Sequence, residues 1–105
     1  MAGQLERYMD LLSARQKLVA SNIANTDTPG YQTQDIDFQS EFQSAMGAPQ
    51  AVPVAGLPSK NDGNNVSIDR ESRMLAEDAL RFQAASSLLH EQITELRSAI
   101  KEGVS

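Results

Sequence analysis

The side chains that most often carry chemistry are sparse in this sequence. His90 is the only histidine and cysteine is absent, so a catalytic triad or a histidine–cysteine metal site lacks its partners. Asp35, Asp37 and Glu41 place three carboxylates close together, but the glycine and further oxygen ligands of a calcium loop do not accompany them. No G-x-S-x-G motif and no glycine-rich phosphate loop occurs. We therefore expect no catalytic residue, no cofactor, no metal site and no enzymatic activity.

Length and charge limit the partners. With 105 residues, the chain has room for one structural domain. Its net charge is −5 and it carries no basic patch, which makes nucleic acid and anionic membranes poor partners. No window approaches the roughly 20 apolar residues of a membrane span. The N-terminus also lacks the pattern of a cleaved secretory signal, so neither a direct membrane span nor signal cleavage is expected.

Both ends of the chain carry a heptad pattern of apolar residues. Near the N-terminus the spacing alternates four-three-four through Leu5, Met9, Leu12, Gln16, Val19 and Ile23. Near the C-terminus the same alternation runs through Ile68, Ser72, Leu75, Ala79, Phe82, Ser86, Leu89, Ile93, Leu96 and Ile100. Such spacing places one side chain per half-heptad on a single face of a helix, where a partner helix packs. The pattern predicts an all-α protein whose long terminal helices pair as an antiparallel, coiled-coil-like hairpin.

Capping and turn residues divide the chain into three parts. Residues 1–31 hold a first helix, expected from about Gln4 to Asn25, followed by a type II turn at Thr28–Tyr31. Residues 32–66 are expected to be extended, with a short helix capped by Asp37 and a flexible linker over 47–65. Residues 67–105 form a long last helix that begins at the capping residue Ser67.

The two helices differ in length, which suggests that other chains contribute to the packing. The last helix would reach roughly 54 Å and the first roughly 33 Å at 1.5 Å per residue. A second apolar line on the first helix, Leu11, Ala14 and Leu18, also widens its apolar face beyond what one partner helix covers. We therefore expect neighbouring subunits to cover the remaining surface. The residues expected to pack are Leu5, Met9, Leu12, Val19, Ile23, Leu75, Phe82, Leu89, Ile93, Leu96 and Ile100.

The end of the first predicted helix carries a recognisable motif, SNIANTDTPGY, from Ser21 to Tyr31. It resembles the signature of bacterial flagellar axial proteins of the rod, hook and hook-junction group. The longer stretch Leu11–Phe38 and the run Asn64–Ile100 are similar to FlgB-type proximal rod proteins. One departure is Gln32, where that family commonly has a basic residue. The signature loop comprises Ser21, Asn22, Ile23, Ala24, Asn25, Thr28, Pro29, Gly30 and Tyr31.

The resemblance implies a structural subunit of the proximal rod in the flagellar basal body. Its implied partners are copies of itself, other rod proteins, a basal-body junction protein near the membrane ring and the flagellar type III export apparatus. It also implies a place in the periplasmic rod, reached by export without a cleaved signal peptide.

Two alternatives stay open at the level of sequence. Composition and periodicity also fit a small soluble adaptor or chaperone-like module that clasps a partner helix. Asn22 and Asn25 could make polar contacts between subunits, or could serve only to end the first helix.

Overall fold

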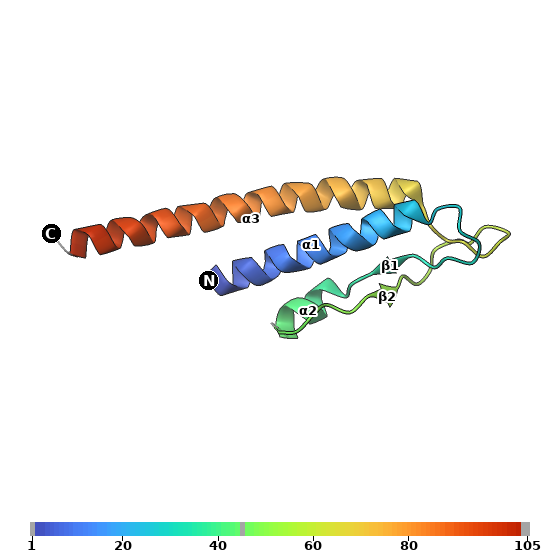
Figure 1. Ribbon diagram of the computed structural model, residues 1–105, viewed down its shortest axis with the longest axis horizontal. Coiled ribbons are helices and arrows are strands. Elements are labelled where there is room, and N and C mark those ends of the chain that lie inside the picture. The colour runs from blue at the N-terminus through green and yellow to red at the C-terminus, as the bar shows by residue number, and fades with distance from the viewer. Residues whose placement is uncertain (1, 45, 104–105) are drawn as a thin grey trace.

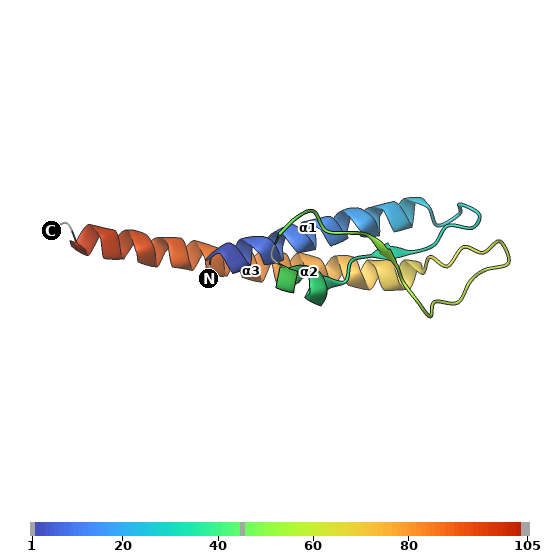
Figure 2. The same ribbon diagram turned by 90° about the horizontal axis from the view of Figure 1, so that it is seen from below.

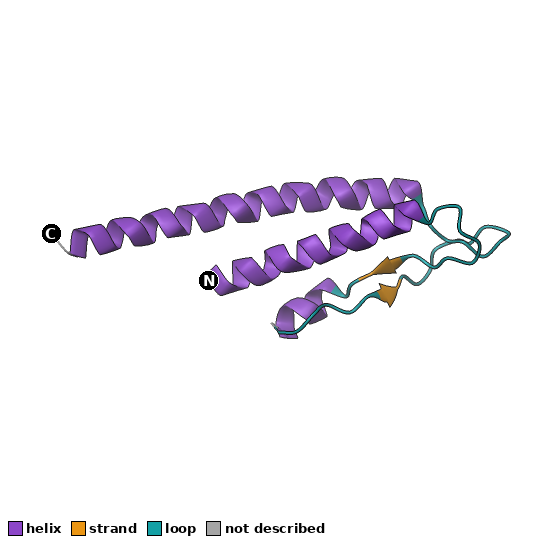
Figure 3. Cartoon of the chain, in the orientation of Figure 1, coloured by secondary structure: helices purple, strands orange, loops and turns teal. Residues whose placement is uncertain are grey.

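The two long terminal helices run antiparallel, and a short hairpin folds back beside the first of them. The computed structural model describes residues 2–44 and 46–103. The elements in chain order are α1 (Ala2–Ala24), β1 (Gln34–Asp35), α2 (Phe38–Ser44), β2 (Val52–Pro53) and α3 (Ile68–Gly103). In Figure 1, α1 runs toward the loop end of the molecule and α3 returns alongside it. The predicted all-α class with paired terminal helices is therefore confirmed, and Figure 3 shows how little strand it contains.

The local signals in the sequence place the ends of these helices. The Ser67 hydroxyl accepts a hydrogen bond from the Arg70 backbone N–H at 3.2 Å, as an N-cap does. The Asp37 carboxylate does the same for the Ser40 N–H at 3.3 Å, at the start of α2. In the turn after α1, Gly30 has a φ of 74°, which fits the expected type II turn. The last helix ends at Gly103, and residues 104 and 105 of the third predicted part lie outside the described residues.

The middle of the chain packs against α1 rather than forming only a linker. β1 and β2 pair antiparallel, with Gln34 opposite Pro53 and Asp35 opposite Val52. Figure 1 shows α1 between α3 and the hairpin with α2, and α1 contacts α3, β1 and α2; Figure 2 shows the same elements from below, with α1 and α3 side by side. Ile36, directly after β1, is buried. The sequence predicts a flexible linker over 47–65, but β2 lies within that range.

The hairpin explains the second apolar line on α1. Leu11 of this line is completely buried, and Leu18 and Ala14 face a groove whose other wall includes Ile36 and Ala51. The chain therefore covers the extra width of α1 with its own residues. The width of α1 alone does not require a helix from another chain.

The core is small and centred on α1. Its buried apolar side chains are Leu11, Leu12, Val19, Ile36, Val66 and Ala85. Around the other end of α1, the Tyr8 ring meets the rings of Phe38 and Phe42 edge to face, at centroid distances of 5.3 and 6.3 Å. The same α1 thus stabilises both the hairpin and α3.

A cavity made at the centre of α1 should destabilise the whole chain. Leu12 is 1% exposed, so Leu12→Ala should lower the free energy of unfolding by about 2–5 kcal/mol. Urea denaturation followed by circular dichroism measures this change. Gln16→Ala, at an exposed position one turn further along, is the control and should change it by less than about 0.5 kcal/mol. Equal effects of the two substitutions would contradict the proposed core.

Candidate subunit-assembly site

Asn22, in the signature motif, is buried at the point where α1, α3 and β1 meet. Its side-chain NH₂ donates to the Gln34 carbonyl at 2.9 Å and to Glu71 Oε1 at 3.1 Å. Its side-chain oxygen accepts from the Gln34 N–H at 3.0 Å and from the Tyr31 hydroxyl at 3.1 Å. An amide side chain offers two donors and an oxygen with two lone pairs, and all of these are used here. The Asn22 side chain therefore pairs with the backbone N–H and carbonyl of Gln34 in β1, as a neighbouring strand would, and it also binds α3.

A second asparagine, Asn64, holds the signature loop against the start of α3. Its NH₂ group donates to the carbonyls of Asn25 and Thr28, at 2.9 and 2.8 Å. Its side-chain oxygen accepts from the Val66 N–H at 2.9 Å. Because Asn64 is completely buried, these bonds also satisfy polar groups that would otherwise lack water.

Asn25 shapes the loop locally. It donates to the Ser21 carbonyl at 2.8 Å and accepts from the Thr28 hydroxyl at 2.9 Å. The exposed positions of the motif include Ser21, Ile23, Ala24, Thr28, Pro29 and Gly30. The side chains of both asparagines therefore form hydrogen bonds within the chain. Asn22 joins α1, β1 and α3, and Asn25 ends the first helix.

Asp35 lies between two arginines from different helices. Its Oδ1 is 3.0 Å from Arg15 Nε on α1, and its Oδ2 is 2.8 Å from Arg70 on α3. Oδ1 also accepts the Ile36 N–H at 2.7 Å. The Arg15 guanidinium lies 4.8 Å from the centre of the Phe38 ring, a cation–π distance. One carboxylate thus joins α1, α3 and the hairpin.

Two acidic residues lie buried in the face of α3 that meets α1, and the heptad spacing of apolar residues does not predict them. The buried residues of α3 are Glu71, Asp78 and Ala85, spaced seven apart. Glu71 pairs with Asn22, and Asp78 lies 3.5 Å from Arg15, two residues that are also seven apart on α1. Acidic residues at this spacing ordinarily indicate a face exposed to solvent, so the sequence pattern does not indicate that Glu71 and Asp78 are buried. The only usable signal was that their spacing matches Asn22 and Arg15.

The residues expected to pack between helices differ in how far the structure buries them. On α1, Leu12 and Val19 are buried, Leu5 and Met9 are half-buried and Ile23 is exposed. On α3, Leu89 is half-buried, whereas Phe82 is 38% and Leu96 61% exposed, and the other exposed members are Leu75, Ile93 and Ile100. Within one chain, the apolar line of α3 is therefore covered only in part, and least at Leu96 and Ile100. This line, Leu75, Phe82, Leu89, Ile93, Leu96 and Ile100, is called the apolar line below.

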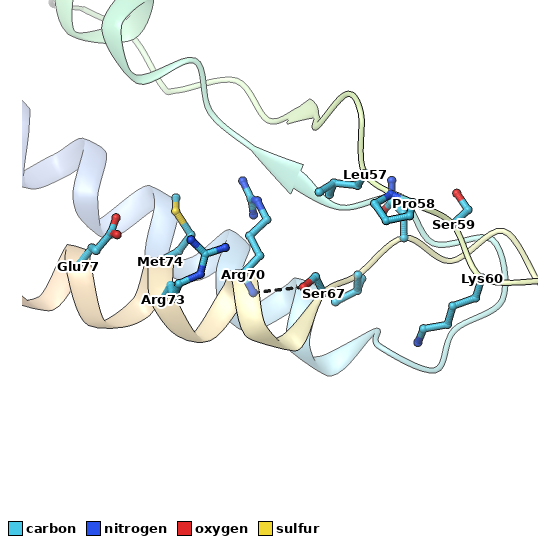
Figure 4. A pocket seen from close by; sticks show the side chains of 11 residues that line it. Leu57, Pro58, Ser59, Lys60, Ser67, Arg70, Arg73, Met74 and Glu77 are labelled. Carbon is cyan, nitrogen blue, oxygen red and sulfur yellow. Dashed lines mark hydrogen bonds between the residues drawn. The ribbon is translucent and has the colours of Figure 1, made fainter.

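An open groove of about 640 Å³ lies beside the start of α3. Leu57 and Pro58 form one wall, and Arg70 and Met74 rise from α3 on the other (Figure 4). Arg70 is already bound to Asp35 and Glu71, so its charge is largely satisfied within the chain. The groove adds a concave surface to the same end of the molecule as the signature loop.

The groups considered for chemistry are dispersed or already paired. His90 is exposed on α3, and its carbonyl accepts the Thr94 hydroxyl at 3.0 Å. Glu41 is paired with Arg7 at 3.4 Å, and Asp35 with its two arginines. Over residues 2–44 and 46–103, no group of three acidic, histidine or cysteine side chains could hold a metal ion.

The environment of the Asp78 carboxyl is unfavourable to its charge. Burial raises the pKa of this carboxyl above its ordinary value of 3.8, and nearby Asp35 adds to the rise. Arg15 and Arg81 act in the opposite direction without overcoming the effect of burial on the pKa. Neither oxygen of Asp78 accepts a well-formed hydrogen bond from the part of the chain that is described.

Comparison with known proteins places this arrangement in a class. The model of a family described as "Flagella basal body rod protein" matches residues 9–32, which cover the second half of α1 and the signature loop. The chain is similar to the flagellar basal body rod protein FlgB of Escherichia coli (strain K12), with 32% identity over 125 aligned residues, 93% of this chain and 91% of the relative. FlgB of Yersinia ruckeri is 30% identical over the same extents. FlgB of Borrelia hermsii is 28% identical over 123 aligned residues, 90% of this chain and 91% of the relative.

The match of α1 and the signature loop to this family model, together with these relatives, therefore defines a flagellar rod protein. The chain belongs to the FlgB family of flagellar basal body rod proteins.

Replacing the Asn22 amide even by a carboxylate of the same shape should destabilise the chain. Asn22→Asp removes both donors and places a carboxylate beside Glu71 and the Gln34 carbonyl. We expect the free energy of unfolding at neutral pH to fall by about 3–5 kcal/mol, because the new buried charge is uncompensated. The control is Asn25→Asp, the same change at a half-buried position with one donated bond, which should cost about 1 kcal/mol. Similar losses in urea denaturation would contradict the role given to Asn22.

Removing the charge of Asp78 should stabilise the chain at neutral pH. Because the pKa of Asp78 is raised in the folded state, the folded chain holds this proton more tightly than the unfolded chain. The charged form therefore lowers stability above the folded pKa, and this penalty disappears as the pH falls to the unfolded value near 3.8. Asp78→Asn should raise the free energy of unfolding at pH 7, and the gain should shrink on acidification. A loss of stability at pH 7 would show that the Arg15 attraction dominates instead.

Proposed function

We propose that this chain is a structural subunit of the proximal rod of the flagellar basal body, and that it assembles through its terminal helices. The observation that carries the proposal is the apolar line of α3, which a single chain of this rod-protein family covers only in part, with Leu96 61% and Ile100 59% exposed. Contiguous exposed apolar surface on a soluble chain marks an interaction site. Burial of such surface contributes about 25 cal/mol per Å², which favours association.

The overhang of α3 supports the same proposal. The pairs Asn22–Glu71 and Arg15–Asp78 fix the alignment of the two helices, so Ala2 lies opposite the region of Glu91. Residues 93–103 of α3 extend past α1, as Figure 1 shows, over roughly 16 Å at 1.5 Å per residue. On this overhang, no helix of the described part of the chain lies beside Ile93, Leu96 and Ile100. A neighbouring subunit is the natural partner for it.

The signature loop supplies a second proposed contact. Its turn is held by Asn64 and Asn22, while Ile23 and Pro29 remain exposed at the end of the molecule opposite the overhang. The Tyr31 hydroxyl is used within the chain, but the loop backbone keeps a fixed shape that a neighbour can recognise. Contacts at opposite ends of a molecule 70 Å long build an open array rather than a closed dimer.

The family also indicates the surroundings of this subunit. We propose that it contacts copies of itself, other rod proteins and the junction protein near the membrane ring, and that the flagellar type III apparatus exports it without signal cleavage to the periplasmic rod. None of the helices over residues 2–44 and 46–103 is long and apolar enough to cross a membrane. The adaptor or chaperone-like alternative finds no support among the relatives, which are named as rod proteins.

A charge on the overhang should block assembly without unfolding the subunit. Leu96→Glu places a carboxylate in the proposed contact, and we expect swimming in soft agar to be lost and basal bodies to lack a complete rod. Because Leu96 is 61% exposed, the free energy of unfolding of the isolated chain should change by less than about 0.5 kcal/mol.

The matched control is Ser98→Glu. It adds the same charge to the same overhang, but two residues away along a helix the side chain points to a nearly opposite face. Swimming should persist in this strain. If both strains swim normally, the proposed contact is wrong.

A further inference from the structure

α3 presents two parallel lines of residues to possible partners, and α1 packs on the less apolar one. The apolar line of α3 stays partly exposed, with Phe82 38% and Leu75 40% exposed, whereas the adjacent line of Glu71, Asp78 and Ala85 is buried against α1. Apolar burial alone would favour the opposite choice, because leucine and phenylalanine gain more from leaving water than a carboxylate does. Something other than apolar burial therefore decides where α1 lies.

We propose that the two polar layers Asn22–Glu71 and Arg15–Asp78 select the face and the alignment with which α1 packs on α3, and so keep the apolar line free for another subunit. The first part of this inference concerns the single chain. The second part rests on the proposed function, since it assumes that another subunit uses the apolar line.

The two layers can select an alignment because they differ in kind. The first joins an amide to a carboxylate at 3.1 Å, and the second joins a guanidinium to a carboxylate at 3.5 Å. If α1 moved by one heptad toward the C-terminal end of α3, Arg15 would lie opposite Ala85 and lose its acidic partner on α3. If it moved the other way, Asn22 would face the segment before α3. Only the observed alignment gives both groups a carboxylate.

The layers can also select a face because Asn22 and Arg15 have further partners that fix their direction. Asn22 is bound to Gln34, and Arg15 to Asp35, on the side of α1 that carries the hairpin. Asp35 in turn reaches Arg70 on α3 at 2.8 Å. Rotation of α3 toward its apolar line would take Glu71 and Asp78 away from these groups and leave polar side chains of α1 against leucine and phenylalanine.

The geometry indicates that these layers supply specificity more than stability. Three buried carboxylate oxygens, both of Asp78 and Oε2 of Glu71, have no hydrogen-bond partner among the described residues. Buried polar groups that are incompletely bonded contribute little to stability, and in some proteins they select one helix arrangement over its competitors. A single polar position fixes the alignment of helices in coiled coils in the same way.

The test replaces both acids of the buried line and measures the alignment directly. In Glu71→Leu/Asp78→Leu, α1 keeps its contacts with the hairpin, since Asn22 retains Gln34 and Arg15 retains Asp35. The matched control is Asp69→Leu/Glu77→Leu, which makes the same substitutions at exposed positions of α3. Spin labels on Ser13→Cys and Ser87→Cys, two exposed sites in a chain without other cysteines, report the distance between the helices.

We expect one narrow distance distribution in the otherwise unchanged chain and in the control. The buried double variant should keep its helix content and show a second population, displaced by up to about 10 Å, which is the rise of one heptad. A single unchanged distribution in that variant would overturn the proposal, because the contacts that it keeps, Asp35 with Arg70 and Asn64 with the signature loop, would then be what fixes the alignment. So would loss of its helical structure, because the layers would then be needed for stability, and so would a broad distribution in the unchanged chain. None of these readouts depends on rod assembly, so the motility test of Leu96→Glu judges the proposed function separately.

Discussion

The carboxylate of Asp35, held between Arg15 and Arg70, is the interaction on which the rest of the structure depends. It joins the first helix, the last helix and the hairpin at one point. Asn22 adds an amide to the same junction and binds both β1 and α3. Because charged and amide groups are costly to bury without partners, their bonds permit few alternative arrangements. The small apolar core around Leu11, Leu12 and Val19 stabilises this junction but does not by itself define it.

This junction gives the subunit two unequal surfaces. The inner side of the helix pair is closed by polar contacts within one chain, and the hairpin closes the far side of α1. The side of α3 next to this contact keeps its leucine, isoleucine and phenylalanine side chains partly exposed. In the proposed assembly this asymmetry leaves a surface for neighbours, since contacts that a chain satisfies internally cannot also hold another subunit. The shorter α1 leaves the end of α3 uncovered and extends the same surface.

Much of the fold follows from the sequence because its signals are local. The heptad spacing indicates both long helices, Ser67 marks the start of α3, and Pro29 with Gly30 indicates the turn. The hairpin is not predictable in this way, because strands of two residues have no period to detect. The face of α3 that meets α1 is also hidden, since Glu71 and Asp78 resemble a solvated face until Asn22 and Arg15 are seen opposite them. The signature motif identifies the family, but its intrachain bonds to Gln34 and Asn64 depend on tertiary structure.

The central claim is that a single chain leaves the overhang of α3 uncovered and that the rod covers it. Hydrogen exchange of the backbone amides in residues 93–103, compared between the isolated chain and purified basal bodies, tests it most directly. The account predicts rapid exchange in the isolated chain and strong protection in the basal body, with amides beside the Asn22–Glu71 pair protected in both. Equal exchange of the overhang in the two states would contradict it.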